Sequence, residues 1–187
     1  MLRLVLNDLS DLDRLENNQV RIELKPTDPR DLLRSVVSAF RAAAQDKQLE
    51  LFVDADPAMP ALVEIDAARV RQVLFNLLAN AIRYTTHGGV RVRMTAQPID
   101  AARVRINVII ADTGAGMSRS QLALIFGRGR VCTEGDGPGL GLAISLRLAR
   151  LMGGQLQAKS ELGEGSMFAF TLDARVLEAP AQRTSAA

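Results

Sequence analysis

The sequence predicts an α/β fold in two layers, with one mixed, mostly antiparallel sheet and helices on a single face. Segments with alternating apolar residues, typical of strands, lie between segments whose apolar residues recur every three or four positions, as in amphipathic helices. The two longest strand segments, residues 89–96 and 102–112, follow each other directly, which favours an antiparallel pair. Helices and strands alternate irregularly along the chain, which indicates a sandwich around one core.

The composition fits one globular domain with a small appendage. The chain has 187 residues, of which 48% are hydrophobic, and a net charge of +2. Its basic residues are scattered without neighbouring aromatic residues, so we expect no nucleic-acid partner. No apolar run reaches the roughly 18 residues of a membrane span, and no signal peptide is recognisable, so we expect a cytoplasmic fragment without membrane contact. The single cysteine, Cys132, can form no internal disulfide and is assigned no chemistry.

The first elements are set by periodicity and by helix caps. In residues 1–17, four leucines share one side of a helix, which needs a partner helix in another chain or in a missing segment. Residues 27–47 predict one helix, with Asp28 as its N-cap and Pro29 at its first position. Further strands are predicted at residues 20–24, 49–55, 61–65, 155–160 and 166–174, and a last helix at residues 140–154.

The helix that Asp66 caps carries an unusual polar face. Its apolar side consists of Val70, Leu74, Leu77, Leu78 and Ala81, and its opposite side of Gln72, Asn76, Asn80 and Arg83. Asn is a poor helix former, so two carboxamides one turn apart suggest a ligand, although a solvated face is the alternative. The carbonyl of Asn80 suits Mg²⁺, which prefers oxygen ligands, and Arg83 suits a phosphate.

Two glycine-rich motifs lie in the second half of the chain. In DTGAGM, residues 112–117, Asp112 follows a strand and either forms a turn or accepts a hydrogen bond from an exocyclic amine such as that of adenine. GDGPGLGLAIS, residues 135–145, starts the last helix, where unpaired N–H groups suit phosphates; a flexible loop and cap is the alternative. Residues 113–141, with a short helix at 120–126, predict a mobile loop.

Taken in order, these motifs resemble those of sensor histidine kinases. DAARVRQVLFNLLANAIRYT, DTGAGM, IF, GPGLGLAIS and GEGSMF are similar to the Asn box, the first glycine box, a partial Phe box, the second glycine box and the last glycine box. The likeness covers residues 20–173. It implies the catalytic ATP-binding domain of the gyrase/histidine-kinase/MutL (GHKL) superfamily, whose fold is the Bergerat α/β sandwich.

The resemblance also implies how the chain is organised. Residues 1–18 resemble the C-terminal end of a dimerisation helix, residues 19–175 the ATP-binding catalytic domain, and residues 176–187 a disordered tail or linker. The chain would then be part of a longer, dimeric kinase, and the resemblance leaves open whether that kinase is hybrid or anchored in the inner membrane. The implied partners are the kinase's own dimerisation helices with their phosphoacceptor histidine, a second copy of the kinase, and the receiver domain of a response regulator.

The same resemblance implies a site for ATP and Mg²⁺. Its catalytic residues are Asn76, Asn80 and Arg83, with Asn80 as the magnesium ligand; its nucleotide-binding residues are Asn76, Asn80, Arg83, Tyr84, Asp112, Gly114, Gly116, Gly137, Gly139, Leu140, Gly141 and Ser166. Asp112 would select adenine, with Gly114 and Gly116 shaping its pocket and Ser166 assisting through water. The backbone N–H groups of the second glycine box would bind phosphate.

Three departures from the family pattern concern the lid, the loop between the glycine boxes. Pro138 stands between two glycines and removes one N–H donor. The Phe box keeps Phe126 but continues as GRGR, and the lid is short. Arg128 and Arg130 either replace lost phosphate contacts or lie in a solvated loop. Lid motion and contact with the dimerisation helix are therefore in question more than ATP binding is.

The resemblance implies donation of the γ-phosphoryl group of ATP to a histidine for relay to a response regulator. Superfamily ATPases carry a Glu where Asn76 stands, and because a neutral amide is a poor base, Asn76 favours a kinase. The only histidine, His87, lies in a turn after the Asn helix, so we expect a surface residue and an acceptor outside this chain. The alternatives are a nucleotide-gated interaction module without kinase activity and a GHKL-type ATPase.

Overall fold

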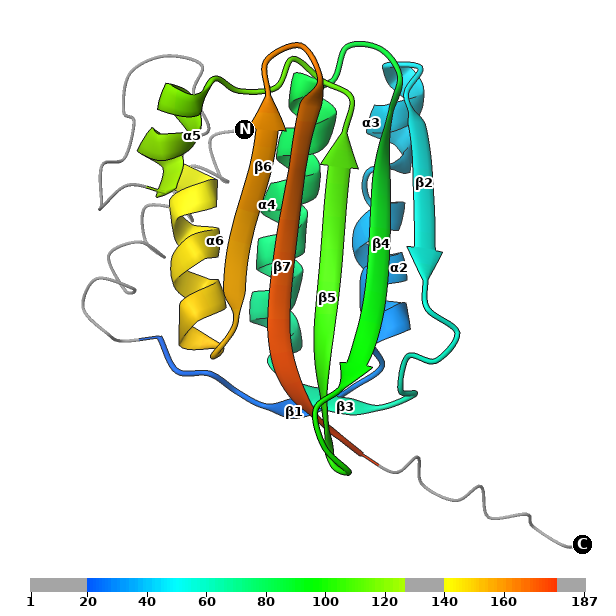
Figure 1. Cartoon of the computed structure of the whole chain (residues 1–187). Coiled ribbons are helices and arrows are strands. Elements are labelled where there is room, and N and C mark those ends of the chain that lie inside the picture. Colours follow the sequence, from blue (N-terminus) through cyan, green and yellow to red (C-terminus); the bar gives the residue numbers. More distant parts are fainter. Residues whose placement is uncertain (1–19, 127–139, 178–187) are drawn as a thin grey trace, which may run out of the picture.

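A computed structural model describes residues 20–126 and 140–177, which form a seven-stranded sheet with helices packed on one face (Figure 1). The strands are β1 (Lys25–Thr27), β2 (Glu50–Ala55), β3 (Val63–Ile65), β4 (Gly89–Pro98), β5 (Arg103–Asp112), β6 (Gln155–Glu161) and β7 (Gly165–Val176). Their order is β1-β3-β7-β5-β4-β2, and β6 also pairs with β7. Only β2 and β4 run parallel among these pairs, which confirms the mixed, mostly antiparallel sheet.

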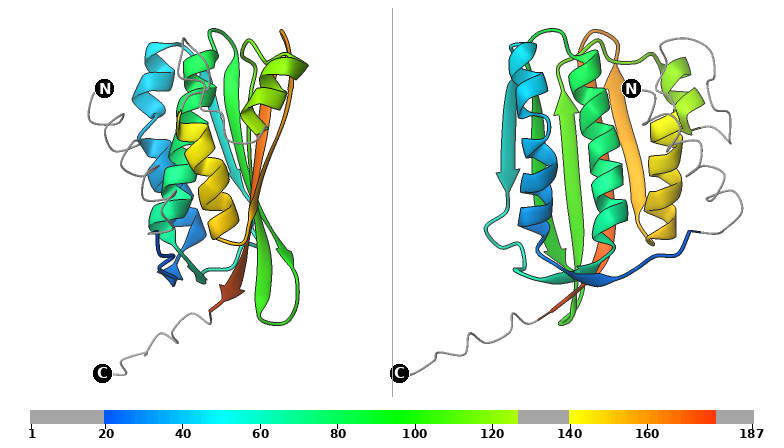
Figure 2. Two further views of the ribbon diagram at one scale, coloured as in Figure 1. Left: turned by 90° about the vertical axis from the view of Figure 1, so that its left-hand side faces the viewer. Right: turned by 180° about the vertical axis from the view of Figure 1, so that it is seen from behind.

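Most of the helices lie to one side of the sheet and leave its other face uncovered, while the helix of residues 119–126 lies beside the edge at β6 (Figure 2). The helices are α2 (Pro29–Ser38), α3 (Arg41–Asp46), α4 (Ala67–Tyr84), α5 (Arg119–Phe126) and α6 (Leu140–Leu151). Side chains of alternate strand residues, such as Val108 on β5 and Phe170 on β7, are fully buried beneath the helices. On the uncovered face, arginines pair with acids across strands, as Arg105 does with Asp173 at 2.7 Å. None of the described helices is long and apolar enough to cross a membrane.

Two predicted elements differ from the structure. Residues 20–24 form no strand, because the backbone N–H of Glu23 donates to the Asp66 carboxylate at 2.9 Å instead of entering a ladder; the strand follows at β1. The single helix predicted over residues 27–47 is two helices, α2 and α3, separated by a turn at Ala39 and Phe40. The turn lets the Phe40 ring pack on Phe75 of α4, with ring centroids 4.5 Å apart.

The domain boundaries predicted from the sequence remain proposals. Residues 1–18, read as the end of a dimerisation helix, and residues 178–187 of the expected tail lie outside the described residues. Within the described residues, the last strand, β7, ends at Val176.

The caps predicted for the helices are confirmed. Asp28 precedes α2 and accepts hydrogen bonds from the N–H groups of Arg30 and Asp31. Asp66 precedes α4 and accepts from the N–H of Arg69 at 3.0 Å, while its other oxygen binds Glu23. Asp66 is 5% exposed, so this carboxylate both starts the Asn helix and ties the N-terminal segment to it.

The C-terminal end of α4 is also fully capped, by three separate parts of the chain. Thr85 donates to the Ala81 carbonyl through its N–H at 3.1 Å and its hydroxyl at 2.6 Å. The Lys47 ammonium donates to the carbonyls of Ile82, Arg83 and Thr85 at 2.8, 2.9 and 3.4 Å, and the N–H of Ala115 donates to the Tyr84 carbonyl at 3.3 Å. Every carbonyl of the last turn therefore has a partner, and the positive charge lies at the negative end of the helix dipole.

Replacing Lys47 by Met keeps the length of the side chain but removes the charge and all three donors. We expect the free energy of unfolding to fall by about 1 to 2 kcal/mol, since water can reach the helix end and replace part of the cap. Urea unfolding of the two proteins measures the difference. Lys25→Met is the matched control, because Lys25 pairs with Glu23 on the surface at 2.8 Å and caps no helix end among the described residues. Equal losses in the two variants would contradict a specific capping role.

Candidate functional site

The polar row of α4 faces the start of α6. The Asn76 amide donates to the Gly141 carbonyl at 3.0 Å and to the Ser145 hydroxyl at 3.3 Å. Ser145 is fully buried and donates in turn to the Gly141 carbonyl at 2.8 Å. A Cβ on Gly141 would lie only 3.2 Å from the Asn76 Cγ, so glycine permits this close approach. Both amide hydrogens of Asn76 are thus used by α6, and the first turn of α6 is held beside the Asn row.

The rest of the row continues along α4 toward its C-terminal end. Asn80 lies one turn beyond Asn76 and is half-buried. Arg83 is exposed, and its guanidinium lies 5.3 Å from the centroid of the Tyr84 ring. Tyr84 is four residues after Asn80, so the helical spacing places the two on one face. The row therefore leads from α6 to the last residue of α4.

Asp112 ends β5 close to that last residue. It is 9% exposed, and its carboxylate accepts a hydrogen bond from the Gly114 N–H at 2.9 Å. Burial raises the pKa of Asp112 above its ordinary value of 3.8, and the N–H groups of Gly114 and Ser166 oppose this by stabilising the charge. A Cβ on Gly114 would lie 2.5 Å from the Tyr84 carbonyl oxygen and 2.8 Å from the Asp112 carboxylate. Glycine is what allows β5 and α4 to meet here.

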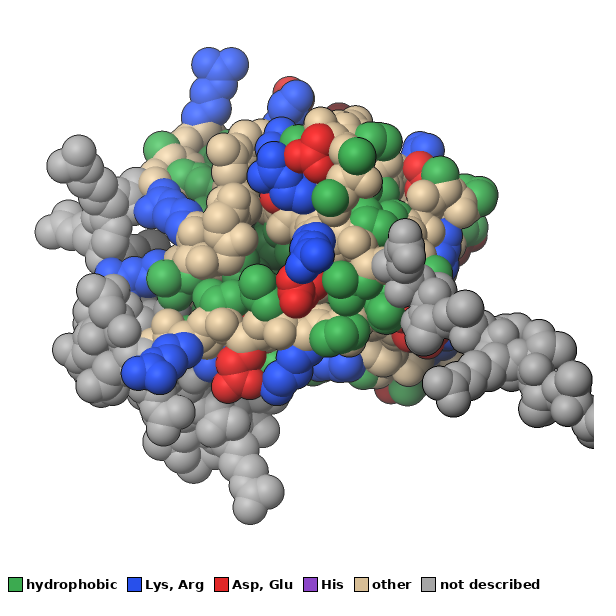
Figure 3. Space-filling model, turned by 90° about the horizontal axis from the view of Figure 1, so that it is seen from below, with side chains coloured by type: hydrophobic (Ala, Val, Ile, Leu, Met, Phe, Trp, Pro, Cys, Tyr) green, Lys and Arg blue, Asp and Glu red, His purple; other side chains and the backbone are tan. Residues whose placement is uncertain are grey.

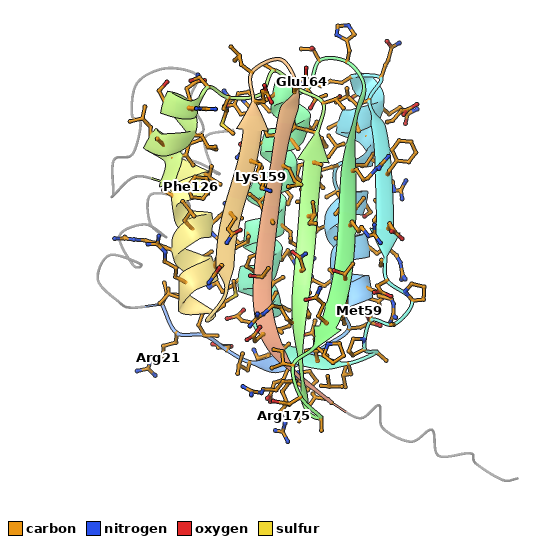
Figure 4. All side chains as sticks on the ribbon, viewed as in Figure 1. Arg21, Met59, Phe126, Lys159, Glu164 and Arg175 are labelled. Atoms are coloured by element: carbon orange, nitrogen blue, oxygen red, sulfur yellow. The ribbon has the colours of Figure 1, made fainter. Side chains whose placement is uncertain are left out.

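The hairpin between β6 and β7 holds the loop that follows Asp112. Gly116 has φ +64°, and a Cβ there would overlap the carbonyl oxygen of Glu161. The N–H of Gly163 donates to the Ala115 carbonyl at 2.8 Å. Figure 4 labels Glu164 in the turn of this hairpin, above the end of β5. Gly116 therefore lies against the hairpin backbone.

The described residues of the predicted site form one connected line. The Asn76 amide binds the Gly141 carbonyl, one residue after Leu140 begins α6. The Tyr84 carbonyl lies against Gly114 and accepts a hydrogen bond from the Ala115 N–H. Asp112 is in register with Ser166 on the neighbouring strand. The predictions made for Arg128, Arg130, Gly137, Pro138 and Gly139 fall outside the described residues. His87 is exposed in the turn before β4, where its carbonyl accepts from the Thr113 hydroxyl at 3.0 Å.

Three residues near the site were missed by sequence reasoning. Ser145 follows Gly141 by one helical turn, and that spacing could have indicated their contact. Ser160 stands opposite Ser166 on the neighbouring strand, which alternation on β6 and β7 could have indicated. Lys47 had no local signal, because its three acceptors are 35 to 38 residues away in the chain.

Two recesses near Asp112 open on the other side of the sheet. One of about 350 Å³ is lined by Ala111, Lys159 and Met167, among others, and Figure 4 labels Lys159 on this uncovered face. A second, of about 410 Å³, is lined by Phe52 and Arg91. Because successive side chains of a strand alternate between faces, the Asp112 side chain points away from both recesses. Asp112 is nevertheless among the residues that line both recesses, and Ser160 and Ser166 are among those that line the first.

Charged groups of both signs are mixed on the face of the molecule that Figure 3 shows. Viewed from below, basic, acidic and apolar side chains lie interspersed (Figure 3). Within residues 20–126 and 140–177, no three or more His, Cys, Asp or Glu side chains gather as a metal site. The oxygen donor expected to meet a metal is instead the Asn80 carboxamide, a ligand type that Mg²⁺ accepts when substrate phosphates supply further oxygens.

Known proteins are similar to this chain in sequence and in fold. The autoinducer 2 sensor kinase/phosphatase LuxQ of Vibrio cholerae is 34% identical over 181 residues, covering 94% of this chain and 21% of LuxQ. The sensor histidine kinase MtrB of Mycobacterium tuberculosis is 37% identical, covering 90% of this chain and 30% of MtrB. The chain thus spans less than a third of the length of these curated relatives.

Solved structures confirm the predicted Bergerat sandwich. The crystal structure of full-length ShkA in complex with AMPPNP matches with a TM-score of 0.79 at 35% identity, covering 97% of this chain and 37% of ShkA. Residues 65–176 match the family described as histidine kinase-, DNA gyrase B-, and HSP90-like ATPase. This match includes α4, Asp112, α6 and the β6–β7 hairpin. The chain therefore belongs to the family of histidine kinase-, DNA gyrase B-, and HSP90-like ATPases.

Proposed function

We propose that this chain is the catalytic ATP-binding domain of a two-component sensor histidine kinase. It binds Mg-ATP and donates the γ-phosphoryl group to a histidine on the dimerisation helices of the same kinase, for relay to a response regulator. The kinase acts as a homodimer, and the domain works in the cytoplasm, where ATP is available. The observation that carries the proposal is that α4 meets the Asp112 turn at Tyr84, where Gly114 allows the approach, and meets α6 at Asn76, where Gly141 does.

The Asp112 end of this site suits adenine. A carboxylate is only an acceptor, and adenine offers the two hydrogens of its exocyclic amine, whereas guanine offers a keto oxygen at that position. Burial makes a hydrogen bond to this carboxylate worth more than one on the surface. Ser166, in register with Asp112, assists at the same place. The AMPPNP in complex with ShkA is an analogue of the nucleotide proposed here.

The other end of the site suits the phosphates and their metal. The first N–H groups of a helix lack partners within the helix, so the first turn of α6, at the positive end of the helix dipole, would favour an anion. Asn80 would ligate Mg²⁺ through its carboxamide oxygen, and the metal would neutralise charge on the phosphate oxygens. Arg83, exposed at the end of α4, would meet a phosphate.

The contacts of Asn76 favour a kinase over an ATPase. The Asn76 amide donates a hydrogen bond to the Gly141 carbonyl. The carboxylate of a Glu at this position would have no hydrogen to donate, and its negative oxygens would face the partly negative carbonyl oxygen. The neutral amide is also too weak a base to activate water. The site would then hold ATP without hydrolysing it until a histidine is presented.

Transfer of labelled phosphate tests the proposed function. We expect the chain alone to bind ATP but to gain no acid-labile phosphate from γ-labelled ATP, since in-line transfer needs a nucleophile held at about 3 to 3.5 Å and His87 lies in a turn. The chain extended upstream through its dimerisation helices should be labelled on a histidine there. His87→Ala should alter neither result. Labelling of the short chain that disappears with His87→Ala would contradict the proposal.

Asp112→Asn tests the base contact. The amide cannot hold the same charge-assisted hydrogen bond, so we expect ATP to bind more weakly by about 1.5 to 3 kcal/mol, which calorimetry measures. Unchanged ATP binding, or GTP binding as tight as that of ATP to the native chain, would reject the assignment of Asp112.

The Tm of Asp112→Asn without nucleotide is the control that checks whether its fold is intact. Because burial raises the pKa of Asp112, the charged carboxylate is less favourable in the fold than in the unfolded chain, and stability is lost as the pH rises from the ordinary pKa through the raised one. We therefore expect Asp112→Asn to melt no lower than the native chain at neutral pH. Its Tm relative to the native chain should rise between about pH 4 and about pH 7.

Asn80→Ala tests the metal ligand. We expect the advantage of Mg-ATP over metal-free ATP to shrink, while Tm changes little because Asn80 lies off the buried face of α4. Calorimetric titration with and without Mg²⁺ measures the advantage. Gln72→Ala, on the same polar face two turns earlier, is the control. An unaltered metal dependence in Asn80→Ala would reject the ligand assignment.

A further inference from the structure

Ser160 on β6 lies at the end of a row of polar side chains that crosses three strands. Asp112 of β5 is in register with Ser166 of β7, and Ser166 is in register with Ser160. The three side chains therefore share the helix-covered face of the sheet, next to the loop at Gly114. Of the row, only Asp112 and Ser166 belong to the proposed nucleotide site.

The hydroxyl of Ser160 has three partners but only one hydrogen. It accepts a hydrogen bond from the Met117 N–H at 2.8 Å, since a backbone N–H can only donate. It lies 2.8 Å from the Gly165 carbonyl oxygen, which can only accept, so the Ser160 hydrogen points there. The third partner is the Ser166 hydroxyl at 3.0 Å. With the Ser160 hydrogen already used, Ser166 must be the donor in this contact.

This assignment determines what Ser166 can offer a ligand. Its hydrogen is directed toward Ser160, so the lone pairs of its oxygen are what remains for the base. Asp112, its neighbour across the strands, is likewise an acceptor. Two acceptors match the two hydrogens of an exocyclic amine and are mismatched with a keto oxygen.

We propose that Ser160 is a specificity-positioning residue that directs the Ser166 hydrogen away from the nucleotide and so makes the base pocket select an amine over a keto group. The proposal rests on the function proposed above. Ser160 itself need not touch the base. Its second role is to hold the loop at Met117 through that N–H, so the hairpin places both the loop and the acceptor.

The test compares ATP with ITP, whose base carries a keto oxygen where adenine has its amine. Calorimetry on the full 187-residue chain gives both affinities. In Ser160→Ala the Ser166 hydroxyl can turn and donate to the keto oxygen, so we expect the preference for ATP over ITP to fall roughly three- to tenfold, the range for one hydrogen bond. Loosening of the loop alone would weaken the binding of ATP and of ITP equally and leave the ratio of the two affinities unchanged.

A second background separates the two roles of Ser160. In Ser166→Ala there is no hydroxyl to direct, so adding Ser160→Ala should leave the ratio of the two affinities unchanged. Ser38→Ala, at an exposed serine at the end of α2, is the control and should also leave the ratio at its native value.

The outcomes distinguish the inference from the function on which it rests. A native chain that binds neither nucleotide would overturn both. A native chain that prefers ATP, together with a Ser160→Ala variant that keeps the full preference, would overturn the role of Ser160 and leave the ATP site in place. A fall in the ratio that is equally large in the Ser166→Ala background would also overturn it, because the effect would not pass through Ser166.

Discussion

Burial of the apolar side of α4 against the sheet determines where every polar residue of that helix points. Leu74, Leu77 and Leu78 are at most 1% exposed and belong to one core with the inward residues of the strands. Turning the helix by one residue would rotate it by about 100° and bury a carboxamide without a partner, at a cost of about 1 to 3 kcal/mol. The orientation of Asn76 toward α6 is therefore a consequence of core packing, and the site depends on it.

The two ends of α4 connect this packing to distant parts of the chain. At its start, Asp66 binds both the helix and the N-terminal segment. At its end, Lys47 and the N–H of Ala115 satisfy the last carbonyls from opposite sides of the sequence. Because the partner of Tyr84 lies in the loop after Asp112, the position of the helix and the position of the base contact are set by the same hydrogen bonds. The proposed phosphate and adenine ends are thereby held at a constant separation.

Strand register determines which face of the sheet carries the side chains of Asp112, Ser166 and Ser160. Side chains of a strand alternate between faces, so a slip of one residue would turn these groups to the uncovered face and expose Phe168 or Phe170 there. Gly116 and Gly163 bring the loop and hairpin together, since the first has positive φ and no room for a Cβ. The same face therefore carries a dry core along most of the strands and acceptors for a ligand at their ends.

The sequence by itself determined the elements whose signals are local. The caps at Asp28 and Asp66, the start of α4 and the long antiparallel strands were predicted because a few neighbouring residues specify each of them. Tertiary structure alone decided the rest. Residues 20–24 failed as a strand because Asp66, 43 residues from Glu23, takes its N–H; the turn at Phe40 exists because its ring packs on Phe75. The roles of Lys47, Ser145 and Ser160 depend likewise on partners that only folding brings within hydrogen-bond distance, and no local pattern records them.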